Sequence, residues 1–487
     1  MRLTFWGAAQ QVTGSMYLLE LEDGYKILID CGIDMERERK VAGENTEIEV
    51  PEEARRPRPS NSMFPFEASE INLMLLTHAH IDHSGNIPNL YREGYEGQVL
   101  CTAPTLELTT LLLQDSAMLN QKRLSSYHRR RGKKKNVPPP INIGEWYSEK
   151  HVKDAERQFV PISFNNRFTI KKGVHVTFVP AGHLLGAAHI VIEVEENGIK
   201  KSIGFSGDIG RYDYPLLLDP QPLPQVDYLL CETTYGNRKH IALKQAEAIL
   251  EEIVIQTCVD MPGRLIIPAF SVGRTQALLY VFNKLAAAGK LPPVKIFSDS
   301  PLAFQSTKVY EKYSRQLNAQ AQQFKKENNV LFDFDNLVYI QDLKESQAVA
   351  NYRQPCIIVS SSGMMEGGRI QHHIAANLEN PKCTILAVGY SSEGTMGHEI
   401  VHGGKKEIRI GDKVMSILAK IVSTDVFSGH GDQDDLLKYV KNQNKDKVKK
   451  VFLVHGELQS MLDFKTLLLE NDYQHVEIPE KGQTYEL

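Results

Sequence analysis

Short apolar runs that end in polar residues set the pattern of the first part of the chain. Such runs cover residues 25–29, 71–76, 176–180 and 201–207, and each is followed within three residues by an aspartate or a histidine. Their length predicts strands, and residues 1–35 are expected to form a pair of strands that closes on Asp30. The leucine-rich segment 105–124 has the spacing of a helix packed by one face.

From residue 211 the pattern changes to strands that alternate with helices. Strands are predicted at 228–231, 264–267, 294–297, 356–359 and 384–388, with helices at 242–257, 274–288, 304–326 and 372–378 between them. This alternation predicts a parallel, doubly wound sheet. Segments 405–410 and 414–421 then return to strands that precede a ligand-bearing loop. We therefore expect one domain inserted into another, with both chain ends needed for one site.

The stretch His78-Ala-His80-Ile-Asp82-His83 carries the clearest chemistry in the chain. It follows the apolar run 71–76 directly, so its side chains lie at a junction between a strand and a loop. Alternation gives His78 and His80 one direction, whereas Asp82 and His83 lie further along the turn. Imidazole and carboxylate ligands without thiolates suit catalytic zinc. The sequence therefore predicts a metal site. The alternative is a polar loop whose histidines are satisfied by hydrogen bonds and bind no metal.

Further polar side chains follow other predicted strands or lie in glycine-flanked loops. They are Asp30, His183, Asp208 and His430. Each alone is typical of a turn, but their recurrence where strands end predicts that they join the first cluster.

Composition places the chain among ordinary globular proteins. It has 487 residues, 42% of them hydrophobic, and a formal net charge of −4. It contains no apolar stretch long enough to cross a membrane. Six scattered cysteines without a Cys-x-x-Cys pair favour free thiols in a reducing compartment, so a cytoplasmic location is expected. One local exception to the acidic balance is the basic run 129–135, interpreted either as a solvated loop or as a flexible arm that binds RNA.

Several motifs together resemble the β-CASP branch of the metallo-β-lactamase superfamily, with matches over nearly the whole chain. The superfamily motif is His78-Ala-His80-Ile-Asp82-His83 with a downstream His, Asp and His. The β-CASP likeness rests on Leu230-Cys-Glu232-Thr-Thr-Tyr-Gly236, Ile267-Pro-Ala-Phe-Ser-Val-Gly273-Arg274, Asp299-Ser300-Pro301, Ser361-Ser-Gly-Met-Met-Glu-Gly-Gly-Arg369, Gly389-Tyr-Ser-Ser-Glu-Gly394-Thr395 and Val454-His455-Gly-Glu457. The likeness is to bacterial and archaeal ribonucleases related to the endonuclease subunit of the cleavage and polyadenylation specificity factor.

The resemblance implies an αββα sandwich interrupted by a doubly wound β-CASP domain. On this basis residues 1–210 and 392–487 are expected to form the metallo-β-lactamase domain, and residues 211–391 the inserted domain. The resemblance also implies single-stranded RNA as the substrate and suggests a homodimer.

The resemblance further implies two zinc ions per chain. It assigns His78, His80 and His183 to the first ion, and Asp208 to a position between the two. The ligands that it assigns to the second ion are Asp82, His83 and His430. Two such ions, about 3.5–4 Å apart, can share a hydroxide and hold a phosphate oxygen in the cleft between the domains.

Catalytic side chains beyond the ligands are also implied. Asp30 is expected to orient a ligating histidine. Glu232 is expected to hold the histidine that protonates the leaving oxygen. The family places that histidine a few residues after Glu-Gly-Thr, which here favours His398, although the spacing is one residue short. The alternatives are Glu399 or neither of these residues.

Phosphate contacts are expected from turns of the inserted domain. Arg274 before a helix, and Ser361, Ser362 and Arg369 in a second glycine-rich turn, offer hydroxyls, backbone amides and guanidinium groups. A tight strand-to-helix turn is the structural alternative for each. The resemblance marks His455 as a residue near the active site, as a phosphate contact.

The function predicted from these features is zinc-dependent hydrolysis of phosphodiester bonds in single-stranded RNA. The motifs leave endonuclease and 5′-to-3′ exonuclease modes open. The alternatives are a DNA-processing β-CASP nuclease, a catalytically silent scaffold of an RNA-processing complex, and a small-molecule hydrolase. The long inserted segment disfavours the last of these, and the complete ligand set disfavours the scaffold.

Overall fold

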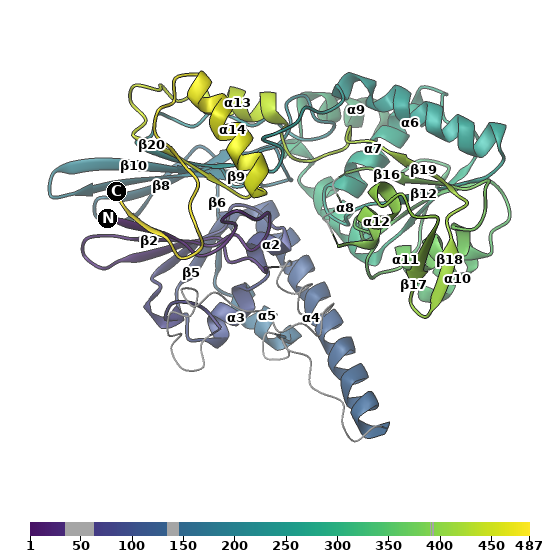
Figure 1. The fold of residues 1–487 in the computed structure, drawn as a ribbon, viewed down its shortest axis with the longest axis horizontal. Helices are drawn as coiled ribbons and strands as arrows, with labels where there is room; N and C mark the ends of the chain where they lie inside the picture. The colour runs from purple at the N-terminus through teal and green to yellow at the C-terminus, as the bar shows by residue number, and fades with distance from the viewer. Residues whose placement is uncertain (35–62, 134–145, 390, 392–393) are drawn as a thin grey trace.

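The computed structural model describes residues 1–34, 63–133, 146–389, 391 and 394–487, which form two units side by side (Figure 1). The first unit contains two seven-stranded sheets, and the second contains a six-stranded sheet. Both chain termini lie next to each other in the first unit, so the chain leaves this unit and returns to it.

The first sheet of the first unit has the strand order β22-β1-β2-β3-β4-β5-β6. Its strands are β1 (Arg2–Phe5), β2 (Tyr17–Glu20), β3 (Lys26–Ile29), β4 (Leu73–Leu75), β5 (Gln98–Thr102), β6 (Phe159–Ile162) and β22 (Thr484–Glu486). Three strands therefore precede Asp30, and the predicted pair was wrong. The short apolar run of β2 forms a strand of its own because it pairs antiparallel with both β1 and β3.

The second sheet has the order β21-β20-β11-β10-β9-β8-β7. Its strands are β7 (Arg167–Lys171), β8 (Val174–Pro180), β9 (Ala188–Glu196), β10 (Ile199–Phe205), β11 (Tyr228–Glu232), β20 (Lys450–Val454) and β21 (Val476–Glu477). β11 pairs parallel with β10 on one side and with β20 on the other. A strand from near the end of the chain thus completes a sheet begun in its first half.

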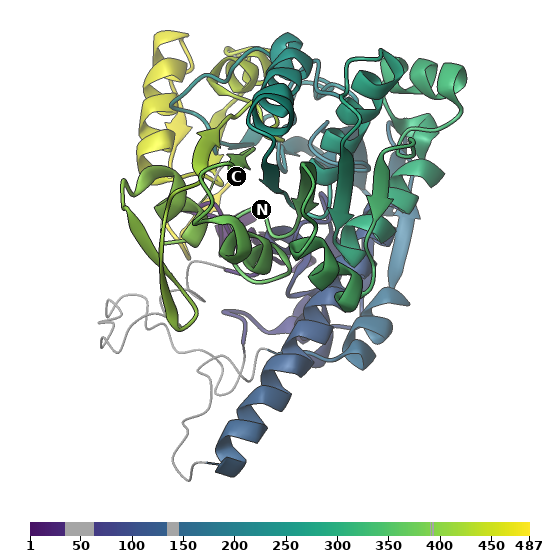
Figure 2. The same cartoon turned by 90° about the vertical axis from the view of Figure 1, so that its right-hand side faces the viewer.

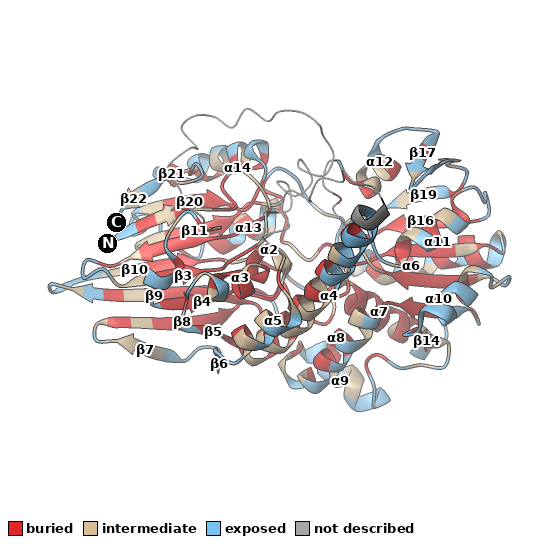
Figure 3. Cartoon of the chain, turned by 90° about the horizontal axis from the view of Figure 1, so that it is seen from below, coloured by how far each residue is buried: buried red, intermediate tan, exposed pale blue. Residues whose placement is uncertain are grey.

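The two sheets pack face to face and helices cover their outer faces. Leu3 and Phe5 of one sheet and Phe178 and Phe205 of the other are buried in the shared core. The covering helices are α3 (Ile87–Arg92) and α5 (Glu149–Glu156) on the first sheet, and α13 (Gln433–Val440) and α14 (Leu458–Glu470) on the second. This arrangement confirms the predicted αββα sandwich, and Figure 3 shows the largely buried strands of the two sheets.

The helix α4 (Ala103–Lys133) is longer than the predicted segment 105–124. Its base packs against the short helix α2 (Ile81–Ser84) and against α8 (Pro301–Lys312) of the second unit. The helix includes the first part of the basic run, so Arg129 and Arg130 lie in a helix and not in a loop, which corrects that prediction. The last two residues of the run, 134 and 135, lie outside the described residues.

The second unit is built on a sheet in which all the described strand pairs are parallel, with the order β14-β13-β15-β12-β16-β19. Its strands are β12 (Arg264–Pro268), β13 (Lys295–Asp299), β14 (Leu337–Tyr339), β15 (Cys356–Ser360), β16 (Thr384–Ala387) and β19 (Lys420–Ser423). Separate buried clusters lie on its two faces, one containing Leu278 of α7 and the other Ile374 of α11. Helices therefore cover both faces, which confirms the predicted doubly wound sheet.

The helices of this unit follow the strands in sequence. They are α6 (Ala246–Val254), α7 (Arg274–Ala287), α8 (Pro301–Lys312), α9 (Ala319–Asn328), α10 (Leu343–Ala350), α11 (Ile370–Asn377) and α12 (Met396–His402). A hairpin of β17 (Glu407–Ile410) and β18 (Lys413–Ser416) follows α12. Short helical turns are η2 (Ala68–Glu70), η4 (Leu243–Gln245), η5 (Ile255–Asp260) and η6 (Ser314–Gln316).

The edge strand β19 lies after residue 391, where the inserted domain was expected to end. It pairs with β16 in parallel, from Thr384 with Lys420 to Ala387 with Ser423. The sheet of the second unit therefore continues past that residue, and the exact domain boundaries stay predictions.

None of the helices in the described part of the chain combines the length and the apolar character that crossing a membrane requires.

Candidate metal centre and active site

The candidate ligands gather where strands of both sandwich sheets end. In the first sheet, Asp30 follows β3 and the stretch that begins at His78 follows β4. In the second sheet, His183, Asp208 and His455 follow β8, β10 and β20. Because these strands end at the same edge of the sandwich, segments far apart in sequence meet at one place.

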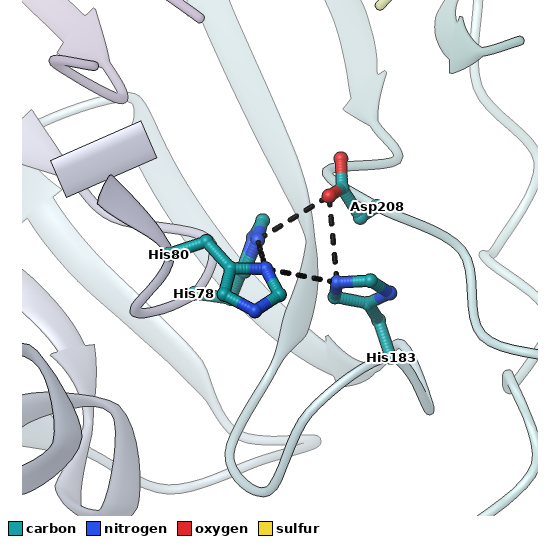
Figure 4. Close-up of side chains that lie close together, drawn as sticks. All are labelled: His78, His80, His183 and Asp208. Carbon is teal, nitrogen blue, oxygen red and sulfur yellow. Dashed lines mark hydrogen bonds and ion pairs between the residues drawn. The ribbon is translucent and has the colours of Figure 1, made fainter. Parts of the chain in front are cut away.

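A first group of ligand atoms consists of His78, His80, His183 and Asp208, all within 4.8 Å of one another (Figure 4). Nδ1 of His80 lies 3.2 Å from Nε2 of His78 and 3.1 Å from Nε2 of His183. Oδ2 of Asp208 lies 3.3 Å from Nε2 of His78 and 3.5 Å from Nε2 of His183. The four side chains come from three segments and point toward one another, so one cation could contact them all.

A second group consists of Asp82, His83 and His455. Nε2 of His455 lies 3.5 Å from Oδ2 of Asp82, and Nε2 of His83 lies 3.2 Å from Oδ1 of Asp208. The predicted set had His430 in place of His455. In the structure His430 lies instead with Asp208 and Glu232, in a third group whose ligand atoms are also within 4.8 Å of one another. The physical reason that His455 joins the second group is the pairing of β20 with β11, which places Val454 opposite Glu232 and directs the next residue to the site.

Asp208 lies between the two groups. Its Oδ2 faces His78 and His183, whereas its Oδ1 faces His83 and lies 3.6 Å from Nδ1 of His455. One carboxylate thus presents a different oxygen to each group. This is the geometry expected of a ligand shared by two neighbouring cations.

The chemistry of the donors fits a metal centre. Among the described residues, the buried atoms Oδ1 of Asp208 and Nε2 of His455 have no hydrogen-bond partner. The nitrogen atoms of three imidazoles also approach one another to within about hydrogen-bond distance, and shared protons cannot satisfy all of them. A cation satisfies them together, and this mixture of imidazole and carboxylate donors suits zinc.

The protonation states of the first group favour ligation. Burial lowers the pKa of His80 to about 3, with a further contribution from His78. Burial also lowers the pKa of His183, so both rings are neutral at pH 7. Burial alone raises the pKa of Asp208, but the surrounding histidines outweigh it and hold that pKa well below its usual range. Neutral imidazole and ionised carboxylate are the forms that bind metal.

Asp30 supports the second group from behind. Its carboxylate accepts a hydrogen bond from Nδ1 of His83 at 2.7 Å, and two more from the backbone amide and hydroxyl of Thr77 at 2.8 Å each. These bonds direct Nε2 of His83 toward Asp208. Asp30 has a φ of 58°, so its backbone adopts the left-handed conformation, which is uncommon for a residue other than glycine.

Glu232 holds His430 beside the two groups. Nδ1 of His430 donates to Oε1 of Glu232 at 3.0 Å and lies 3.9 Å from Oδ2 of Asp208. Glu232 is fully buried, and its Oε1 also accepts from the backbone amide of Ile209. Because Nδ1 is occupied in this way, Nε2 of His430 is the nitrogen that remains for a substrate.

His398, the predicted partner of Glu232, lies elsewhere. Its Nδ1 donates to the backbone carbonyl of Ser391 at 3.3 Å, and its ring lies against His402, with centroids 5.1 Å apart. Glu399, the alternative, forms an exposed ion pair with Lys405. The structure therefore pairs Glu232 with His430 and not with either predicted residue. The prediction of His398 relied on the Glu-Gly-Thr motif. In the structure, Thr395 of this motif serves as the N-cap of α12.

The side chains of the inserted domain that were predicted to contact phosphate largely form hydrogen bonds to other residues of the fold. Arg369 donates to Asp299 at 2.6 Å and to the backbone carbonyls of Ile340 and Gln341. The hydroxyl of Ser361 donates to Ser300 Oγ, and that of Ser362 to the backbone carbonyl of Glu366. Arg274 donates to the backbone carbonyl of Val388. The structural alternative thus accounts for the described contacts of these four residues.

The inserted domain nevertheless touches the site through the loop that carries His183. The backbone amide of Leu185 donates to the hydroxyl of Tyr310 in α8 at 3.3 Å. Leu184 packs in the same buried cluster as Val272 and Tyr310. A β-carbon at Gly273 would approach Leu184 to 2.5 Å, so this contact is close. The metal site therefore lies where the two domains meet.

Arg211 ties together the segments that cross between the domains. Its guanidinium is buried and donates to the backbone carbonyls of Asp425 at 3.2 Å, Val426 at 3.1 Å and Ile241 at 2.8 Å. Arg211 itself follows Asp208, residues 425–426 lead toward His430, and Ile241 lies on the segment that follows Glu232. Arg211 therefore fixes the relative positions of the loops that follow Glu232 and carry His430.

Two supporting residues were not identified from the sequence. Thr77 fixes Asp30 with two hydrogen bonds, and Thr234 places its hydroxyl 3.1 Å from Nδ1 of His455. The signal available was position alone, because each threonine lies within two residues of a candidate, His78 or Glu232.

Comparisons with known families agree with this geometry. Residues 10–235 match the metallo-beta-lactamase superfamily, and residues 275–400 match the Beta-Casp domain. Residues 414–479 match the Zn-dependent metallo-hydrolase RNA specificity domain. The last match spans both His430 and His455.

Several curated proteins are similar over almost the whole chain. Ribonuclease TTHA0252 of Thermus thermophilus is 31% identical over 468 residues, which cover 96% of each chain. The transcription termination factor FttA of Methanosarcina mazei is 29% identical, with 99% of this chain and 70% of the relative covered. An RNase J-like protein of Methanocaldococcus jannaschii is 29% identical, with 95% and 94% covered.

Proposed function

Because the chain belongs to the β-CASP ribonucleases of the metallo-β-lactamase superfamily, we propose that it hydrolyses phosphodiester bonds of single-stranded RNA with two zinc ions. The observation that carries the proposal is the pair of ligand groups that share Asp208, beside the Glu232–His430 pair. All of these side chains lie within one continuous cluster where the two domains meet.

In this proposal, His78, His80 and His183 hold one ion, and Asp82, His83 and His455 hold the other. Asp208 contacts both ions, and Asp30 orients His83. Zinc bound in this way lowers the pKa of water to about 7 and neutralises charge on a phosphate oxygen.

We assign the proton donor to His430 instead of His398. Glu232 fixes the ring through Nδ1, and the charges of Glu232 and Asp208 outweigh burial and raise the pKa of His430. A protonated ring held in this way can deliver the Nε2 proton to the leaving 3′- or 5′-oxygen. A carboxylate that orients a histidine for proton transfer is a common catalytic arrangement.

The proposal extends to location and assembly. All six cysteines are buried free thiols, which suits the reducing cytoplasm. A homodimer belongs to the proposal through family resemblance, and light scattering of the purified chain measures it.

The test is a time course of RNA cleavage by the zinc-loaded protein, with RNA labelled at its 3′ end and carrying a 5′-monophosphate or a 5′-hydroxyl. Internal fragments from both substrates identify an endonuclease. Shortening from the 5′ end that is faster with the monophosphate identifies a 5′-to-3′ exonuclease. Asp208→Ala serves as the inactive control, and zinc content is measured on both proteins.

The outcome that contradicts the proposal is RNA cleavage no faster than that of the Asp208→Ala protein. Cleavage of single-stranded DNA at the same rate as RNA would instead support the DNA-processing alternative. A zinc content near one ion per chain in the active protein would refute the two-ion assignment.

A further inference from the structure

The helix α4 projects away from the body of the molecule. Figures 1 and 2 show its C-terminal half extending beyond both units. Residues up to Ala117 include buried positions such as Leu108, Leu113 and Ala117 itself, whereas Met118 and Leu119 are 43% and 44% exposed. At 1.5 Å per residue, the part from Met118 to Lys133 is about 24 Å long.

The exposed half of α4 carries positive charge along one side. Lys122, Arg123, Arg129 and Arg130 are all exposed. Successive residues turn by about 100°, so positions seven apart lie on nearly the same side, and these four side chains fall within an arc of about 120°. Tyr127 is buried and lies about 40° beyond the edge of this arc, next to Arg123. We call the four residues the basic stripe.

Few acids lie near the basic stripe, and the one that interacts with it along the helix is Asp115, seven residues before Lys122. From residue 116 to residue 133 the sequence contains no aspartate or glutamate. Within the described part of the chain, no ion pair to a carboxylate joins any of the four cations. Elsewhere on the protein surface, lysines pair often with acids, as Lys312 does with Glu107 at 2.6 Å.

The base of α4 is fixed close to the metal centre. Ile81, which precedes Asp82, packs against the cluster that contains Leu113 and Ala117. On the other side, Glu107 accepts hydrogen bonds from Lys312 and Tyr313 of the second unit. The basic stripe begins about 8 Å beyond Ala117 and ends about 20 Å beyond it, measured along the helix axis.

We propose that α4 is a rigid arm whose basic stripe binds the phosphate backbone of the substrate RNA outside the active site. This inference rests on the proposed function and names a second contact surface for the same substrate. The charge pattern favours nucleic acid, because arginine and lysine in two rows along a helix match a line of phosphates. The chain as a whole carries a net charge of −4, so attraction of RNA needs a local positive surface of this kind.

The decisive variant replaces the basic stripe with neutral side chains, as K122Q/R123Q/R129Q/R130Q. A matched control neutralises four exposed cations elsewhere, as K344Q/R353Q/K382Q/K447Q. Binding of fluorescent RNA is measured by anisotropy between low and moderate salt, with RNA of about 4 and about 20 nucleotides. At about 3.4 Å or more per nucleotide, only the longer strand can occupy the metal centre and also span the stripe, whose far end lies about 20 Å beyond Ala117.

For the longer RNA we expect the slope of log affinity against log salt to fall by about 3, since each neutralised contact with a single strand contributes about 0.7. Cleavage of the short RNA should keep its kcat and KM within about twofold, because the metal centre is intact. The control variant should retain the wild-type slope for both lengths.

Two results overturn the inference. One is an unchanged salt slope for the longer RNA, and the other is an equal loss for both lengths, which would mean damage transmitted through Ile81. Absence of RNA cleavage by the wild-type protein would refute the proposed function instead. The two failures are separable because the salt slope is measured by binding and does not depend on cleavage.

Discussion

Replacement of His430 by alanine separates the role of this histidine from that of a metal ligand. In the structure, Nδ1 of His430 lies 3.0 Å from Oε1 of Glu232. The same nitrogen lies 3.9 Å from Oδ2 of Asp208. If His430 donates a proton to the leaving oxygen, the variant keeps its metal ions and loses only the proton transfer. General acid catalysis contributes about 10²- to 10⁴-fold, so kcat on RNA should fall by that factor, equal to about 3–5 kcal/mol.

A substrate with a good leaving group reveals the cause of that loss. Bis(p-nitrophenyl) phosphate releases a phenolate that needs no proton at neutral pH. His430→Ala should therefore hydrolyse it at a rate within about tenfold of the wild-type rate, while RNA cleavage falls by at least about 100-fold. His398→Ala is the matched control, and it should retain most of both activities because its ring contacts Ser391 and His402.

Zinc content measured on the same preparations tests the alternative. If His430 were a ligand of the second ion, as the sequence predicted, His430→Ala would lose zinc and both substrates would slow equally. An inactive His398→Ala protein beside an active His430→Ala protein would also refute the assignment. Either result would return the acid role to α12.

The remaining predictions concern the supports of the site and the pH dependence of stability. Asp30→Asn should weaken zinc binding by about 10- to 100-fold, measured by competition with a chelator, and unchanged affinity would exclude an orienting role. Burial and a neighbouring carboxylate raise the pKa of Asp435 to about 6, so the folded state is penalised progressively as pH rises from about 4 to above 6. Asp435→Asn should therefore raise the unfolding free energy by about 1 kcal/mol near pH 8, after discounting for partial exposure. This gain in unfolding free energy should vanish near pH 4. An equal gain at both pH values would contradict this reasoning. Arg211→Ala removes three hydrogen bonds to backbone carbonyls, although the carbonyl of Asp425 still accepts from the amide of Ser428. The variant should reduce kcat on RNA more than on bis(p-nitrophenyl) phosphate, because it displaces the loop of His430. An equal loss on both substrates would show that Arg211 acts on folding alone.

Much of the fold could be predicted because short apolar runs mark buried strands. The runs at 25–29, 71–76 and 176–180 correspond to β3, β4 and β8, and the alternation after residue 228 corresponds to the parallel sheet. The hydrophobic pattern of a strand did not predict which sheet the strand joins when its partner lies far away in the sequence. β19 reads as one of several strands near the C-terminus, and only its long-range pairing with β16 shows to which sheet it belongs.

The first ligand group was likewise predictable, because alternation fixes the shared direction of His78 and His80 within a few residues of one strand. The partner of Asp82 and His83 was not, since two histidines near the C-terminus both follow apolar segments. His455 follows β20, whose register with β11 is a contact between residues more than 200 positions apart. No local pattern carries that register, and the sequence therefore did not predict that His455 joins Asp82 and His83.

The separate positions of His430 and His455 follow from how the chain crosses between the domains. His455 leaves the end of a strand within the sandwich, where β11 and the backbone carbonyl of Ala8 hold it in place. His430 lies instead on the segment that returns from β19 of the inserted sheet, and Arg211 anchors that segment at Asp425. A ligand position built only from sandwich strands suits a metal that must stay bound through every turnover. A proton donor on a crossing segment is placed by both domains at once, so its alignment depends on how they meet. If the proposed roles hold, metal retention depends on the sandwich alone, whereas proton transfer depends also on how the inserted domain meets it.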